Sequence, residues 1–410
     1  MHELQVRATI VTPPPPGAAA PDEARPSELT HREPEAAAEA AIVNLASISE
    51  ADRSGWRELL ASRDESAPFV EEEWVAAWSQ AFRPREALLV CGWEGGRLVG
   101  LGALQSLSES WAGRRTGVLQ SLTNFESPRF EFLSSCSRLD VQEQLGRALC
   151  DERRWDVIRL EYLPEDSPTL RAGLKVADEL GWHRVVEATY ESPWRSLPRP
   201  PAAWDEGLTR KFKANLRNRE RRLDALGEVS FEVVTGSGAW HRALQIFYEL
   251  EASGWKRERG TAIAQRATAK AFYDGLVGRT ADHMWLPILR VSGRPAAAQL
   301  VRVAGRTMFM LKTAYHPNFA PYAPGQLLTA RLIQHGIEQG MDALDFLGEQ
   351  MTWKADWGAR LRPHYHLLLF SPSLTGRYAY WMRYGLRERA KAVPGLRRLV
   401  RWLRARRGRA

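Results

Sequence analysis

The sequence has 410 residues, of which 44% are hydrophobic and 26% are charged, and its formal net charge is +8 at pH 7. A chain of this length exceeds what one hydrophobic core usually serves, so we expect two modest domains. No apolar run approaches the roughly 20 residues that span a bilayer, and the amino terminus lacks the basic-then-apolar pattern of a signal peptide. These features exclude a membrane-spanning helix and predict a cytoplasmic protein.

The three cysteines, Cys91, Cys136 and Cys150, are odd in number and lack the spacing of a metal site. This usage is typical of a reducing compartment. His364 and His366 alternate on a strand-like run, but no third ligand lies near them in the sequence. We therefore expect structural roles for both histidines and no metal.

The first 41 residues contain PPPPGAAAP and acidic, alanine-rich sequence, which predicts disorder. Residues 42–195 alternate between helical and strand-like patterns and predict an N-terminal α+β domain. The Gly95-Gly96 pair between two strand patterns indicates a hairpin. The expected elements are helices at 53–62, 71–82, 141–150 and 169–180, and strands at 87–93, 98–105 and 157–162.

A proline-rich segment from Pro193 to Pro201 is predicted to be a linker, after which the same order of elements recurs over residues 196–372. The expected strands are 229–234, 286–291 and 296–303, and the expected helices are 240–251 and 264–277. An earlier helix in this half carries seven basic residues beside a buried apolar stripe, and such a face attracts phosphorylated ligands or is simply solvated. The basic residues are Arg210, Lys211, Lys213, Arg217, Arg219, Arg221 and Arg222.

The most informative segment runs from Lys312 to Gly358. A buried strand at 308–315 is followed by a loop with three prolines, a helix at 326–339 that Gly340 ends, and a strand at 343–347. Pro324 and Gly325 stand at the start of that helix. Its free N–H groups and dipole favour an anion such as a pyrophosphate; alternatively, Pro324 presets the turn and Gly325 relieves its strain.

Basic charge is concentrated at the end of the chain. Residues 377–410 contain 12 Lys or Arg and one acid, Glu388, and a tail of +11 in a chain of +8 leaves −3 for the rest. Aromatic and aliphatic residues intersperse the arginines, and Pro394-Gly395 divides the tail (373–410) into two helical pieces. Such a segment can contact an anionic membrane surface, bind nucleic acid, or pack on the domain with a solvated arginine face.

Taken together, these predicted elements and motifs resemble the GNAT superfamily of acyltransferases in its FemAB/CelD-like branch. The matching runs extend over about residues 42–370: LKTAYHPNFA, YAPGQLLTARLIQHGIEQGMDALDFLGEQMTWKADWG, TRKFKANLRNRERRLDALGEVSFEVV, EASGWK and PAAAQLV, and in the amino-terminal half PFVEEEWVAAWSQAF, EGGRLVGLGALQ and TNFESPRFEFL. The resemblance implies an α+β fold of two tandem GNAT-like domains, each a mixed, mostly antiparallel sheet flanked by helices. It also implies direct attack of an amine on a bound acyl donor, without a covalent acyl-enzyme.

The donor is either acyl-CoA or aminoacyl-tRNA. The GNAT coenzyme A loop usually has several glycines, whereas YAPGQLL keeps one. The chain has no long charged heptad stretch of the kind that forms the coiled-coil arm in some aminoacyl-tRNA users, so we favour acyl-CoA, with acetyl-CoA first. We expect an N-acyltransferase acting on an amino sugar or on a polysaccharide or lipid precursor; the alternatives are an aminoacyl-tRNA-dependent ligase and a noncatalytic scaffold with a membrane-binding tail.

Candidate site residues follow from the same segment. Asp345 puts a carboxylate on an apolar strand, where it acts as a base, orients the acceptor, or forms a structural salt bridge. Glu349 is the competing carboxylate, and Tyr315 ends the preceding strand. The resemblance places Lys354 at a phosphate or at the developing oxyanion. The remaining candidates are Tyr322, Pro324, Gly325, Gln326 and Leu327 for the donor, and Trp255, Arg217 and Trp353 for the acceptor.

Overall fold

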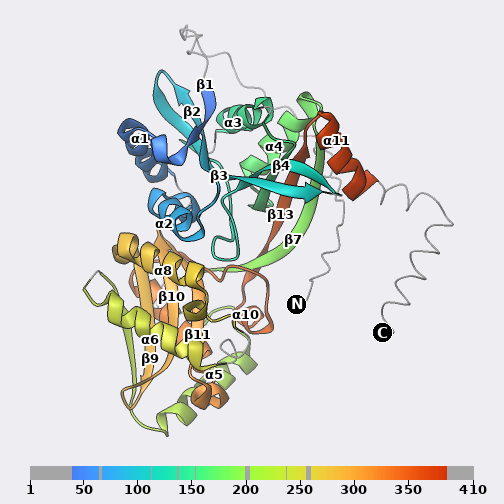
Figure 1. Ribbon diagram of the computed structural model, residues 1–410. Helices are drawn as coiled ribbons and strands as arrows, with labels where there is room; N and C mark the ends of the chain where they lie inside the picture. The colour runs from blue at the N-terminus through green and yellow to red at the C-terminus, as the bar shows by residue number, and fades with distance from the viewer. Residues whose placement is uncertain are drawn as a thin grey trace, which may run out of the picture.

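The computed structural model describes residues 39–63, 67–111, 113–135, 138–152, 154–198, 204–236, 238–254 and 260–385. Within these residues one 13-stranded mixed sheet runs through the molecule, in the order β1-β2-β3-β4-β6-β13-β7-β12-β11-β10-β9-β8, with β5 beside β3 (Figure 1). Two strand pairs, β4 with β6 and β11 with β12, are parallel, and the other pairs are antiparallel. The predicted α+β class is confirmed.

The first half of the chain follows the predicted order closely. Its helices are α1 (Glu50–Ala61), α2 (Glu72–Phe82), α3 (Leu139–Asp151) and α4 (Pro168–Glu179). Its strands are β1 (Glu39–Asn44), β2 (Ala87–Glu94), β3 (Arg97–Trp111), β4 (Arg114–Ser121), β5 (Leu133–Ser134), β6 (Val157–Pro164) and β7 (His183–Ser196). β1 begins inside the segment 1–41 that the composition predicts to be disordered, and residues 1–38 lie outside the described residues.

The second half repeats this plan. Its helices are α5 (Arg210–Asp224), α6 (Trp240–Ser253), α8 (Ala267–Thr280), α9 (Pro324–Glu338), α10 (Thr352–Ala355) and α11 (Leu374–Tyr380). Its strands are β8 (Val229–Val234), β9 (Met284–Val291), β10 (Arg294–Ala304), β11 (Thr307–Tyr315), β12 (Ala343–Asp345) and β13 (Arg360–Phe370). In each half a helix, α3 or α9, connects the two strands of the parallel pair, so the predicted duplication of one α+β unit is present in the topology.

Two long strands join the halves. β13 lies between β6 and β7, and the end of β7 pairs with β12, so Figure 1 shows β7 and β13 running together from one half into the other. The predicted linker from Pro193 to Pro201 is therefore wrong at its start, because 193–196 are the end of β7. Pro193 lacks an N–H, but its carbonyl accepts the Phe346 N–H at 2.9 Å, so the strand continues through it. The predicted division between residues 195 and 196 stays a prediction.

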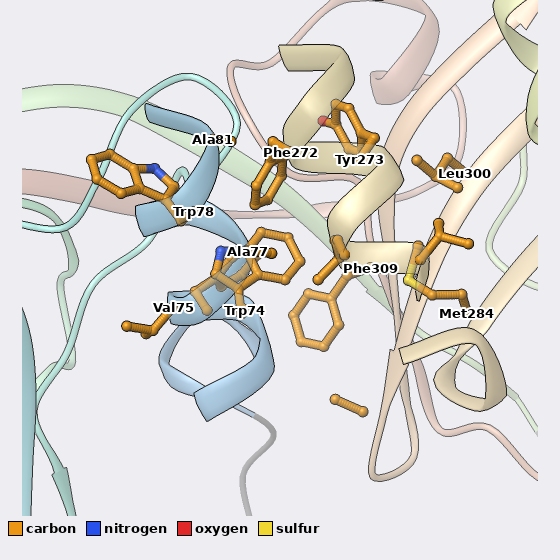
Figure 2. Packing of buried hydrophobic residues seen from close by; sticks show 14 of the residues in the cluster. Trp74, Val75, Ala77, Trp78, Ala81, Phe272, Tyr273, Met284, Leu300 and Phe309 are labelled. Carbon is orange, nitrogen blue, oxygen red and sulfur yellow. The ribbon is translucent and has the colours of Figure 1, made fainter. Parts of the chain in front are cut away.

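A shared apolar core fixes the two halves against each other. Figure 2 shows Trp74 of α2 next to Phe272 of α8, with Phe309 of β11 close to both. The Trp74 and Phe272 rings meet edge to face at 5.3 Å between centroids. Because this cluster is one continuous core, loops from the first half have a fixed position at the strand ends of the second half.

Among the described residues no helix is both long and apolar enough to cross a membrane. Of the cysteines, Cys91 and Cys150 are buried free thiols, and burial raises the pKa of each to about 12. Cys136 and residues 386–410, which hold most of the predicted basic tail, lie outside the described residues.

Candidate active site

The parallel strands β11 and β12 separate soon after they meet. They pair over Thr307–Phe309 only, whereas β11 continues along β10 as far as Tyr315 and β12 ends at Asp345. A register shift between β10 and β11 leaves Leu311 as the extra residue of a β-bulge. Bulges bend a strand and redirect its side chains, and they are frequent next to active sites. The diverging ends of β11 and β12 are therefore the natural place to look for a site.

On one face of the sheet, the start of α9 packs on the end of β11. Ala323 has a left-handed backbone with φ 48°, and Pro324 opens the helix without a side-chain cap. A Cβ added to Gly325 would lie 3.5 Å from the Thr313 methyl group and 3.9 Å from the Tyr315 ring. The positive end of α9 thus lies directly beside the β-bulge strand, and it favours an anion there.

Helix α5 brings basic side chains to the start of α9. Arg219 donates a hydrogen bond to the side chain of Gln326, and the Arg222 guanidinium lies 5.2 Å from the centre of the Tyr322 ring. Arg217 and Leu327 line an open groove of about 170 Å³ between the two helices. The predicted donor residues and Arg217 are therefore neighbours, in a basic environment.

The turn after β12 is organised by a buried lysine. Leu347 and Gly348 both have left-handed backbones, with φ 52° and 60°. The Lys354 ammonium donates to the carbonyl of Leu347 at 2.5 Å and to that of Glu349 at 2.9 Å, which holds this strained turn. Burial lowers the pKa of Lys354 to about 8, and the charge of Lys312 acts in the same direction.

The other predicted residues of this turn have different surroundings. The side chain of Glu349 is exposed, whereas Trp353 is half-buried and meets Phe346 edge to face at 6.0 Å. The Lys354 Nζ atom lies 5.8 Å from the centre of the Trp353 ring. The structure thus brings Lys354, Glu349 and Trp353 together around one turn.

Asp345 forms a buried ion pair with Arg129, which comes from the first half of the chain. Arg129 donates to Asp345 Oδ2 at 2.7 Å, and the Leu347 N–H donates to Oδ1 at 2.9 Å. Burial opposes the ionised carboxylate, but these partners outweigh it and hold the pKa of Asp345 below its usual 3.8. Such a carboxylate is a poor general base and a good positioning group, which favours the salt-bridge interpretation of Asp345.

A second residue from the same loop was missed by the sequence analysis. Glu126 is 3% exposed. It pairs with Lys312 at 2.9 Å and with Arg266 at 2.8 Å, and it accepts a hydrogen bond from the Tyr273 hydroxyl at 2.7 Å. Burial raises its pKa, but Lys312 and the other partners lower it further, so Glu126 is held ionised.

The signal for this loop was present in the motif TNFESPRFEFL. Asn124 accepts the N–H groups of Glu126 and Ser127, which makes a compact turn of the kind that asparagine favours. The turn directs Glu126 toward β11 and α8, and Arg129 toward β12. No property of the local sequence indicates which distant strands these charges contact.

The remaining predicted residues are Tyr315, Trp255, His364 and His366. Tyr315 is 40% exposed at the end of β11, on the α9 side. Trp255 lies outside the described residues. His364 is buried and stacks on Tyr190, and burial lowers the pKa values of His364 and His366 to about 3 and 4. Among the described residues no group of three or more His, Cys, Asp or Glu side chains has a metal-binding arrangement. The catalytic and binding roles stay predictions.

Comparison with known proteins gives one family match and a similar fold. Residues 210–355 match the family model described as an acetyltransferase (GNAT) domain. The fold is similar to the crystal structure of FemX, with a TM-score of 0.57 and 11% identity over 81% of this chain and 98% of that one. No curated protein matches the sequence.

Two further solved structures are less similar. L-PGS from Bacillus licheniformis has a TM-score of 0.46 and 14% identity, with 82% of this chain and 96% of that one covered. A tandem GNAT protein from the clavulanic acid biosynthesis pathway has a TM-score of 0.44 and 15% identity, with 82% and 99% covered.

Residues 210–355 are therefore similar to an acetyltransferase (GNAT) domain, as the resemblance to the FemAB/CelD-like branch implied, and the chain as a whole has a FemX-like fold of two tandem GNAT-like units.

Proposed function

We propose that the protein is an N-acyltransferase that transfers an acyl group from acyl-CoA, with acetyl-CoA first, to the amine of an amino sugar or of a polysaccharide or lipid precursor. One observation carries the proposal: the diverging ends of β11 and β12 lie between the positive start of α9 on one side and the Lys354 turn on the other. The first suits a phosphorylated donor, and the second suits a charge that develops during reaction.

The reaction needs no covalent enzyme intermediate. The amine nitrogen attacks the carbonyl carbon of the thioester, the carbon–sulfur bond breaks, and the amine loses a proton while the thiolate gains one. An ammonium has three N–H donors, and Lys354 uses two of them on the Leu347 and Glu349 carbonyls. The third can stabilise the oxyanion or protonate the thiolate, for which a pKa of about 8 is suitable.

The other roles follow from the surroundings of each group. Glu349 is exposed and suits the base that takes the amine proton, whereas Asp345, paired with Arg129, orients the turn. Tyr315, at the end of β11, supplies a hydroxyl group near the reacting carbonyl. Arg217 and Trp353 contact the acceptor.

Calorimetric titration with acetyl-CoA and longer acyl-CoAs tests the donor. Gly325→Glu places a carboxylate at the start of α9 and is expected to abolish binding. Gly278→Glu is the matched control, because a Cβ there meets nothing within 4 Å and the position is on α8, away from α9. Binding that survives Gly325→Glu, or no binding of any acyl-CoA to the wild type, would overturn the acyl-CoA donor.

The exposed face of α5 favours one alternative, an aminoacyl-tRNA-dependent ligase. This helix has seven basic and two acidic residues, and Arg210, Lys211 and Arg217 are exposed. If charged tRNA is the donor, its affinity should fall steeply with salt, and a Lys211→Gln/Arg217→Gln variant should reduce that slope by about two.

The second alternative, a noncatalytic scaffold with a membrane-binding tail at 377–410, depends largely on residues outside the described ones. It requires that Lys354→Ala and Asp345→Ala leave cellular function intact.

A further inference from the structure

A tryptophan and two arginines occupy the middle of the continuous sheet, where its two halves meet. Trp194 of β7 lies between β12 and β13, opposite Asp345 on one side and Arg360 on the other. The guanidinium carbons of Arg360 and Arg362 lie 5.9 and 5.3 Å from the centre of its ring. Trp194 and Arg362 are half-buried and Arg360 is exposed.

These two arginines differ from the others on this part of the fold. Arg129 pairs with Asp345 at 2.7 Å, Arg159 pairs with Glu109 at 2.6 Å, and Arg302 pairs with Glu71. No described carboxylate pairs with Arg360 or Arg362, and neither side chain donates a hydrogen bond to a described residue. Their guanidinium groups are held by the indole ring while their N–H donors stay available.

The position relative to the candidate active site is fixed by strand register. Directly opposed residues of antiparallel strands point to the same face, so Trp194, Arg360 and Asp345 share one face of the sheet. Two strand spacings separate Arg360 from Asp345, which is about 10 Å. Leu344, on the other face, packs into the cluster that contains α9, so the arginines lie opposite the proposed donor side.

We propose that Arg360, Arg362 and Trp194 bind a phosphate or diphosphate group of the acceptor. This inference rests on the proposed function. The distance of about 10 Å between Arg360 and Asp345 would place the phosphate about one sugar ring away from the reacting amine. Stacked guanidinium groups keep their planar forks oriented, which suits bidentate contact with phosphate oxygens. The three residues lie outside the range 210–355 that matches the acetyltransferase domain.

The test is calorimetric titration of pyrophosphate into the full-length protein and two matched variants. R360Q/R362Q removes the proposed site, whereas R171Q/R242Q removes the same charge from exposed positions on α4 and α6. We expect a binding event that survives R171Q/R242Q and is weakened at least about tenfold in R360Q/R362Q. R360K/R362K, which keeps the charge and loses the forks, should give an intermediate loss.

The proposal would be overturned if pyrophosphate bound R360Q/R362Q as tightly as the wild type, or if it bound neither the wild type nor any variant. Thermal melting monitors folding, and because each arginine contacts the Trp194 ring but has no ion pair among the described residues, we expect only a small decrease in the melting temperature. Uridine diphosphate and farnesyl diphosphate then distinguish a nucleotide-linked from a lipid-linked acceptor. Since pyrophosphate binding needs no acyl donor, failure of the acyl-CoA titration would leave this result interpretable.

Discussion

The buried ion pair between Arg129 and Asp345 offers a direct test of how the two halves build the site. The two residues are 7% and 3% exposed and their closest atoms are 2.7 Å apart. Arg129→Met should leave an unpaired buried carboxylate, and Asp345→Asn an unpaired buried guanidinium. Breaking one side of such a pair costs about 3–5 kcal/mol of unfolding free energy.

The double variant removes both charges, so it should cost much less than the sum of the single variants. We expect a coupling free energy of at least about 2 kcal/mol. Asparagine at position 345 keeps an acceptor for the Leu347 N–H, so the turn after β12 is retained and the cycle isolates the charge interaction. Urea unfolding, followed by circular dichroism and tryptophan fluorescence, supplies the four free energies.

The same cycle has a defined pH dependence. Because the pKa of Asp345 lies below 3.8 in the folded protein, the stability it contributes is present at higher pH and is lost as the pH falls through the folded value. The difference between wild type and Asp345→Asn should therefore be constant from about pH 8 to pH 5 and shrink below about pH 4. Single-variant costs under about 1 kcal/mol, or additive effects, would refute the reasoning.

Three further predictions test other parts of the structure. Folding lowers the pKa of Lys354 from 10.5 to about 8, so the unfolded chain binds more protons than the folded one between these pH values. The unfolding free energy of the wild type should therefore gain about 2 kcal/mol over that of Lys354→Met from pH 8 to pH 10. A constant difference would contradict the burial of Lys354. Glu126→Gln breaks the pairs with Lys312 and Arg266 and should cost about 3 kcal/mol in urea unfolding, whereas a cost under 1 would mean that the loop docks weakly. Trp74→Ala should cost about 3–5 kcal/mol, and because its core is shared, calorimetry should show both halves melting earlier; a shift in one half alone would argue against a shared core.

Much of the local structure follows from the sequence. The expected strand at 229–234 is β8 with the same bounds, and the strand, loop, helix and strand around Gly325 are β11, α9 and β12. These elements have clear hydrophobic periodicity and turn residues at their ends, which are local properties. β4 was not predicted, because its run RRTGVLQS begins with two arginines and a threonine and lacks a regular apolar pattern.

In the candidate site, too, local features could be predicted from the sequence, whereas contacts between distant segments could not. The start of α9 is a local feature, so its residues were selected from the sequence with a stated chemistry, whereas Lys354 was selected through the family resemblance. Arg129 and Asp345 are 216 positions apart along the chain, and nothing near either residue indicates the other. Glu126 was overlooked because an acidic residue in a polar turn looks like an exposed one until the strands that it contacts are known.

The sequence by itself determined the fold class and most local elements, because backbone preference and burial pattern act over a few residues, whereas the duplicated unit was expected mainly from the family resemblance. Only the tertiary structure decided that β13 returns between β6 and β7, that one loop of the first half inserts Glu126 and Arg129 into the second, and that Trp194 meets Arg360. Each of these arrangements is a pairing between distant segments, stabilised by burial and charge that exist only once the chain has folded.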